Sequence, residues 1–93
     1  MSEGTQAVDR AAVLLLAVLG APAPIAFSDL VAASGLPKST VSRLVSSLER
    51  NGLVQRDAHG TILPGVALTD YALSLRPEDN LAYLAQQIGR AHV

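Results

Sequence analysis

The sequence predicts a small, mostly helical fold that carries one short β-hairpin, and three observations lead to this prediction. Residues 37–51 have apolar side chains at helical spacing, and Gly52 follows them as a stop signal. A tight turn at 34–37 that contains a glycine connects this helix to a shorter one before it. After Gly52 the apolar residues alternate with polar ones, as they do in strands. Two helices joined by a tight turn and followed by a hairpin are typical of a winged helix-turn-helix domain.

The segment 37–51 is predicted to be a helix with two chemically different faces. The apolar face, which we expect in the core, consists of Val41, Leu44, Val45 and Leu48. The opposite face and its edges carry positive charges and hydroxyl groups, namely Lys38, Ser39, Thr40, Ser42, Arg43, Ser46, Ser47 and Arg50. Ser and Thr are mediocre helix formers, but short hydroxyl side chains suit a helix that closely approaches phosphates and base edges. A surface helix that is merely rich in serine is the alternative.

A first helix is predicted at 5–19, and its centre at 11–19 is apolar on every side. Such a helix is either buried all round or contacts a second subunit as well as its own core. Nine apolar residues are too few to span a bilayer, and Pro22 and Pro24 prevent a longer helix. The segment before it lacks the positive charges of a secretory signal.

The remaining segments complete a three-helix core with a wing. Before the helix at 37–51 we expect a very short strand at 25–27 and a helix at 29–34 capped by Ser28. After it we expect a hairpin of strands 53–57 and 61–63. A helix at 66–76, with Leu68, Ala72 and Leu75 on one side, and a final helix at 78–90 complete the prediction. Pro37 is expected at the first position of its helix. The predicted domain covers residues 1–76, and residues 77–93 are predicted to be a linker helix that leads toward an absent effector domain.

Charge is distributed unevenly over a chain whose net charge is −1. Residues 36–60 hold four Lys or Arg side chains and two acidic ones, so the positive potential is local to the helix and hairpin. The sequence has no cysteine, no Gly-rich phosphate loop and no nucleophile with a base at motif spacing, so it predicts no enzyme, cofactor or metal site. The lack of cysteine fits a reducing compartment, and we expect a cytoplasmic protein.

Four blocks of the sequence form a further pattern: Arg10 before an aliphatic helix, residues 27–44 with the run Gly-Leu-Pro-Lys-Ser-Thr, residues 48–54, and Leu63-Pro64-Gly65 at the end of the wing. Together these blocks resemble the N-terminal DNA-binding domain of IclR-type transcription regulators. The resemblance implies a dimeric repressor or activator that binds a pseudo-palindromic double-stranded DNA operator. It also implies a further domain that binds a small-molecule effector. The wing departs from the family pattern, because Ile62 stands where an aromatic residue is often found.

Roles for single residues follow from where such domains contact DNA. We expect the helix at 37–51 in the major groove, with Arg43 reading a base edge, or else a phosphate, and with Lys38 and Arg50 on phosphates. The wing at 53–64 is expected on the flanking backbone through Gln55, Arg56 and His59, and Ser28 either contacts the backbone or only caps its helix. The first helix is expected to form a homodimer. The alternatives are a winged-helix module that binds or dimerises with proteins, and a MarR-like regulator.

Overall fold

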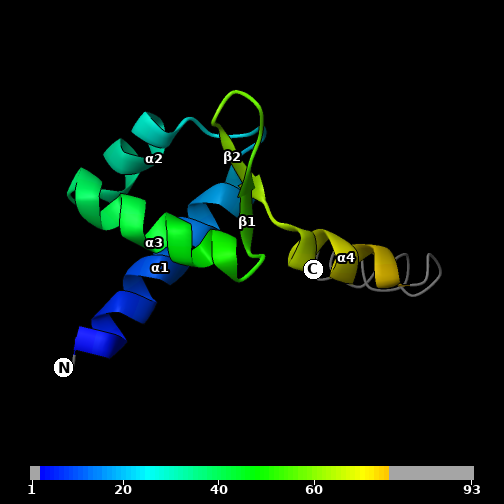
Figure 1. Cartoon of the computed structure of the whole chain (residues 1–93), viewed down its shortest axis with the longest axis horizontal. Coiled ribbons are helices and arrows are strands. Elements are labelled where there is room, and N and C mark those ends of the chain that lie inside the picture. Colours follow the sequence, from blue (N-terminus) through cyan, green and yellow to red (C-terminus); the bar gives the residue numbers. More distant parts are fainter. Residues whose placement is uncertain (1–2, 76–93) are drawn as a thin grey trace, which may run out of the picture.

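The computed structural model describes residues 3–75, which form four helices and one hairpin (Figure 1). In chain order the elements are α1 (Glu3–Gly20), α2 (Phe27–Ser34), α3 (Lys38–Arg50), β1 (Val54–Arg56), β2 (Ile62–Pro64) and α4 (Val66–Ser74). This order confirms the predicted winged helix-turn-helix arrangement. The predicted helix at 78–90 and the predicted linker at 77–93 lie outside the described residues.

The core lies where α1, α2 and α3 meet the hairpin. It is aliphatic, and its buried members are Leu14, Val18, Leu30, Val41, Val45, Leu48, Val54 and Ile62. Leu44, which was expected in the core, is only partly buried and packs against it, as does Leu53. Burying each large aliphatic side chain contributes about 1.5–3 kcal/mol before the entropy of ordering the chain opposes it. The apolar stripe of α3 therefore anchors that helix and fixes which of its faces points outward.

Helix α1 is buried on one side only. Leu14 and Val18 are in the core, whereas Val8 is 68% exposed and Leu16 is 66% exposed. Of the two alternatives predicted for α1, burial on every side is therefore not found within residues 3–75, where α2, α3 and β2 cover only the side that carries Leu14. No helix in the described part of the chain is long and apolar enough to cross a membrane.

Both helices of the helix-turn-helix begin at a different residue from the one predicted. Helix α2 begins at Phe27, so Ser28 lies inside its first turn and does not cap the helix. The capping position is held by Ala26, which has an extended backbone and whose carbonyl accepts the Leu30 N–H at 3.0 Å. Phe27 packs against the core, and this packing outweighs the capping preference of Ser28. Pro37 is the N-cap of α3 with ψ 146°, and its carbonyl accepts the Val41 N–H at 3.0 Å.

The end of α3 is closed as the sequence predicted. Gly52 has φ 75°, a left-handed conformation that strains residues with a Cβ atom. The Leu53 N–H donates to the Leu48 carbonyl at 2.9 Å and the Gly52 N–H donates to the Glu49 carbonyl at 3.1 Å. These two bonds form a Schellman motif, which turns the chain directly into β1.

The wing is a two-stranded antiparallel hairpin in which Val54 pairs with Pro64, Gln55 with Leu63 and Arg56 with Ile62. The strand predicted at 25–27 is reduced to one bridge between Ile25 and Ile62, because Phe27 already belongs to α2. In this bridge the Ile25 N–H donates to the Ile62 carbonyl with an N to O distance of 2.9 Å, and the Ile62 N–H donates to the Ile25 carbonyl at 2.8 Å. Ile62 is fully buried, so the wing contributes a core residue.

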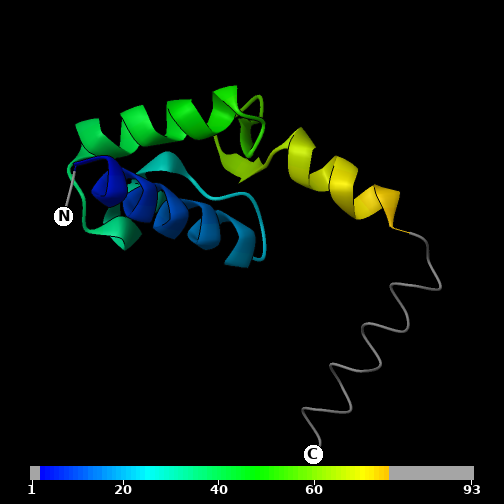
Figure 2. The ribbon, with the colours of Figure 1, turned by 90° about the horizontal axis from the view of Figure 1, so that it is seen from below.

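Helix α4 projects away from the three-helix core (Figures 1 and 2). Leu68 is half-buried and Ala72 and Leu75 are exposed, so the apolar side predicted from these residues does not join the core. Its start is nevertheless fixed. The Gly65 N–H donates to the Leu53 carbonyl and the Ala67 N–H donates to the Gly52 carbonyl, each at 3.0 Å.

Candidate nucleic-acid interface

The outer face of α3 is open to solvent over its whole length. Lys38, Ser39, Ser42, Arg43 and Arg50 are exposed, and Thr40, Ser46 and Ser47 are half-buried along its edges. Val41 and Val45, on the inner face, are fully buried. The two faces predicted from the sequence are thus separated in the structure, and the cationic, hydroxyl-rich face is not covered by any other segment within residues 3–75.

The cations on this face have no intramolecular partner among the described residues. Lys38, Arg43 and Arg50 form no ion pair or hydrogen bond there, since the ion pair present in that part of the chain joins Arg56 to Glu49. The first turn of α3 holds no acidic residue, and its last turn holds Arg50. Exposed cations that form no ion pair keep most of their attraction for an anionic partner.

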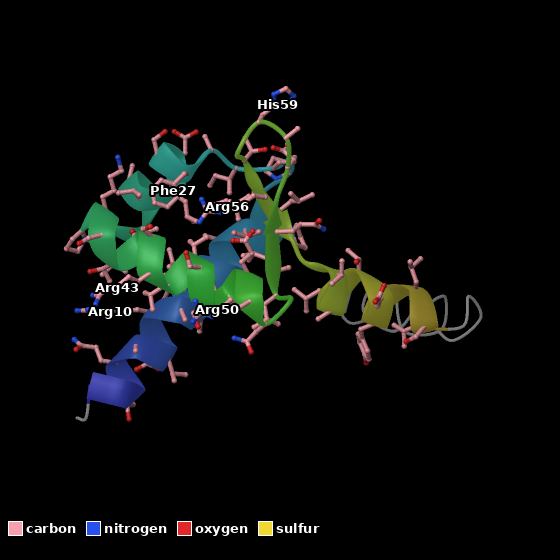
Figure 3. The ribbon with its side chains drawn as sticks, viewed as in Figure 1. Arg10, Phe27, Arg43, Arg50, Arg56 and His59 are labelled. Atoms are coloured by element: carbon pink, nitrogen blue, oxygen red, sulfur yellow. The ribbon has the colours of Figure 1, made fainter. Side chains whose placement is uncertain are left out.

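Arg56 differs from these cations, because it is held against the protein. Its Nε lies 3.4 Å from Oε1 of Glu49 at the end of α3, and its guanidinium carbon lies 5.9 Å from the centre of the Phe27 ring. Its side chain is 35% exposed. The structure therefore places Arg56 between the wing, α2 and α3 (Figure 3).

The other two predicted wing residues lie apart from each other. The Gln55 side-chain amide donates to the Pro64 carbonyl at 2.9 Å across the hairpin, whereas His59 is exposed at the tip of the wing (Figure 3). The tip is shaped by Asp57, which sequence reasoning did not single out. Its carboxylate accepts the backbone N–H groups of His59 at 2.9 Å and Thr61 at 3.1 Å, and the Thr61 hydroxyl.

These bonds to Asp57 also have an electrostatic consequence. The Thr61 hydroxyl, followed by the backbone N–H groups of His59 and Thr61, lowers the pKa of the Asp57 carboxyl below its ordinary value. The tip of the wing thus carries a firmly ionised carboxylate beside the exposed His59. Ser28 lies on another element, at the second position of α2, where its side chain is exposed.

Arg10 on α1 is a further cation that sequence reasoning did not place at the site. It lines a cleft of about 490 Å³ together with Gln6 and Ala7 of α1 and Thr40, Arg43 and Leu44 of α3. Figure 3 shows Arg10 and Arg43 close together where the two helices cross. The signal available in the sequence was a single arginine directly before the apolar run 11–19.

A recognition-type helix with a free polar face, a preceding helix joined by a tight turn, and an adjoining hairpin define a winged helix-turn-helix protein. The chain belongs to the family of the IclR helix-turn-helix domain, whose sequence profile matches residues 7–58. It is 35% identical over 71 residues to the HTH-type transcriptional regulator KipR of Bacillus subtilis (strain 168), which covers 76% of this chain.

Solved structures agree with this assignment. The repressor BlcR of Agobacterium tumefaciens superimposes with a TM-score of 0.65 at 28% identity over 91% of this chain. An IclR-family regulator from Rhodococcus sp. gives a TM-score of 0.65 at 28% identity over 76% of this chain and 28% of its own. The chain spans 28% of the length of KipR and 36% of that of BlcR.

Proposed function

We propose that the chain binds double-stranded DNA in a sequence-specific manner, as the DNA-binding part of an IclR-type transcription regulator. The observation that carries this proposal is the uncovered face of α3, where free Lys and Arg side chains alternate with hydroxyl groups opposite a largely buried apolar stripe. Helix α3 enters the major groove and the wing lies on the flanking backbone.

The residues of α3 divide into base readers and phosphate binders. Arg43 lies in the second turn and reads a base edge, because a guanidinium can donate two hydrogen bonds to guanine. Lys38 and Arg50, near the two ends of the helix, bind phosphates. The hydroxyl groups between them serve either partner, and they belong to Ser39, Thr40, Ser42, Ser46 and Ser47.

The wing and α2 make supporting contacts to the backbone. His59 reaches the DNA from the tip of the wing, whereas Gln55 and Arg56 do so only by exchanging their present partners, Pro64 and Glu49. Ser28 lies at the start of α2, where backbone N–H groups and the helix dipole favour an anion.

The exposed side of α1 is the proposed dimer contact. Val8, Ala12 and Leu16 follow one another at intervals of four residues, and Leu19 continues the same stripe. Large exposed apolar side chains on one helix face are typical of an interface. A symmetric dimer through α1 presents two copies of α3, so the operator is pseudo-palindromic. Control by a small-molecule effector requires a further domain of the regulator.

This function needs neither catalysis nor a cofactor. Residues 3–75 contain no cluster of His, Asp and Glu suited to a metal ion. Family membership favours regulation, as a repressor or an activator, in the cytoplasm where the DNA is.

The salt dependence of duplex binding tests the proposal. Each phosphate contact lowers the logarithm of the binding constant by about 0.9 per tenfold increase in salt. With Lys38, Arg50 and the wing engaged, we expect a slope of about −3 per monomer for a mixed-sequence duplex. A protein-binding module that uses α1 instead would show no such slope, and its partner binding would survive Arg43→Ala.

A further inference from the structure

The cleft between α1 and α3 is a concave feature with a positively charged lining. Its lining holds two arginines and two neutral polar side chains, from Gln6, Arg10, Thr40 and Arg43, but no carboxylate. Neither arginine forms an ion pair within residues 3–75. Two guanidinium groups that share a cleft repel each other, and a bound anion relieves that repulsion.

The acidic residue next in sequence does not neutralise the cleft. Asp9 precedes Arg10 on α1 but lines a separate, mainly apolar hollow, together with Val13, Ser34 and Leu36. No ion pair joins Asp9 to Arg10 among the described residues. Arg10, which borders both hollows, therefore keeps its charge available on the side that faces α3.

The position of the cleft matches one strand of a bound duplex. Thr40 and Arg43 belong to the first two turns of α3, and the wing with His59 at its tip lies on the other side of that helix (Figure 3). A helix in the major groove runs between two sugar-phosphate strands. The wing faces one of these strands, and the cleft is placed to face the other.

We propose that Arg10 is a DNA-backbone contact: the cleft between α1 and α3 receives a phosphodiester group of the strand opposite the wing. The Arg10 guanidinium binds the phosphate oxygens, Gln6 and Thr40 add neutral donors, and Arg43 extends past the same phosphate toward the bases. This inference rests on the proposed function, and it extends the interface from the helix-turn-helix and wing onto α1.

The test compares Arg10→Ala with the unchanged chain on two duplexes, one of random sequence and one selected by the protein from a random pool. We expect Arg10→Ala to weaken binding to both duplexes alike, by about tenfold at constant salt. The salt slope should become shallower by about 0.9, the contribution of one phosphate. Arg10→Lys should restore most of the affinity, because a lysine still binds a phosphate as a point charge.

A control separates this contact from a general effect of charge. Leu73→Glu lowers the net charge by the same amount at a side chain that is 83% exposed on α4, far from the cleft, and should leave affinity and slope unchanged. Scanning the selected duplex with single methylphosphonates adds a second readout. Neutralising one particular flanking phosphate in each half-site should weaken binding of the unchanged chain. The same substitution should leave the binding of Arg10→Ala unaffected.

Three results would overturn the inference: an unchanged slope in Arg10→Ala, a loss of affinity confined to the selected sequence, or an unaltered methylphosphonate pattern. In each case the unchanged chain still binds duplex DNA with a salt slope, so the proposed function stands. If the unchanged chain itself shows no slope, the proposed function fails as well.

Discussion

Nε of Arg56 lies 3.4 Å from Oε1 of Glu49, and this ion pair ties the first strand of the wing to the last turn of α3. The arginine also lies over the ring of Phe27, with 5.9 Å from its guanidinium carbon to the ring centre. One side chain of the wing thus contacts both helices of the helix-turn-helix. Among the cations of the described residues, Arg56 is the one that forms an ion pair with an acidic side chain.

Removing that ion pair should strengthen nonspecific binding. Glu49→Gln leaves Arg56 without its carboxylate and removes one negative charge beside the face of α3, so affinity for random duplexes at low salt should rise a few-fold. The slope against salt should become steeper by up to about 0.9. Asp70→Asn on α4 makes the same charge change far from that face, and an equal gain in this variant would refute a local effect.

The same pair should matter little for stability. Both side chains are more than one-third exposed, and exposed ion pairs contribute about 0–1 kcal/mol. Urea denaturation of Glu49→Gln should therefore show a loss of unfolding free energy below about 1 kcal/mol. A loss of several kcal/mol would mean that the contact holds the wing in place.

Arg43 and Lys38 should differ in the kind of binding they support. Arg43→Ala removes a bidentate base contact, so discrimination against altered operators should fall by about 1–3 kcal/mol at one base pair of each half-site. Lys38→Ala should weaken all duplexes alike. Binding selections on random pools with both variants measure this difference, and the opposite result would exchange the two roles.

Gly65 should tolerate no side chain, although its backbone is not strained. A Cβ atom there would lie 2.2 Å from the Gly52 carbonyl oxygen, because the start of α4 packs directly on the end of α3. Gly65→Ala should lower the unfolding free energy by at least about 2 kcal/mol in thermal or urea melts. Gly20→Ala is the matched control: nothing lies within 4 Å of its Cβ, so no loss is expected.

The wing tip should respond to pH through Asp57. Because the Thr61 hydroxyl lowers the pKa of this carboxyl in the folded chain, the ionised form stabilises the turn. This stabilisation is present above the ordinary pKa of 3.8 and is lost as the pH falls through the lowered value. NMR titration should give a midpoint below 3.8 that rises in Thr61→Val, and a midpoint at or above 3.8 in the unchanged chain would contradict the bonds seen here.

The apolar stripe of α1 should mediate dimerisation. Leu16→Glu places a carboxylate on a side chain that is 66% exposed, so the fold should persist while the dimer dissociation constant rises at least about tenfold. Leu73→Glu on α4 is the control for an added exposed charge. Sedimentation equilibrium measures both, and equal association of the two variants would exclude α1 as the contact.

The features that local spacing determines were predictable from the sequence. The buried stripe of α3, its closure at Gly52 and the hairpin that follows all depend on neighbouring residues. The residue at which α2 begins was not predictable in this way. Packing of Phe27 on the core outweighed the preference of Ser28 for the capping position. The contact of Arg56 with Phe27 and the cleft that Arg10 shares with Arg43 join residues far apart in sequence, and no pattern in one segment encodes them.

We expect the outer face of α3 to meet DNA while its apolar face stays in the core. Mapping amide and side-chain NMR shifts of the chain during titration with its selected duplex tests this most directly. The largest changes should occur at Lys38, Ser39, Ser42, Arg43 and Ser46, with smaller ones at the wing tip and Arg10 and none on α4. Changes confined to the α1 stripe of Val8, Ala12, Leu16 and Leu19, with α3 unaffected, would contradict the account.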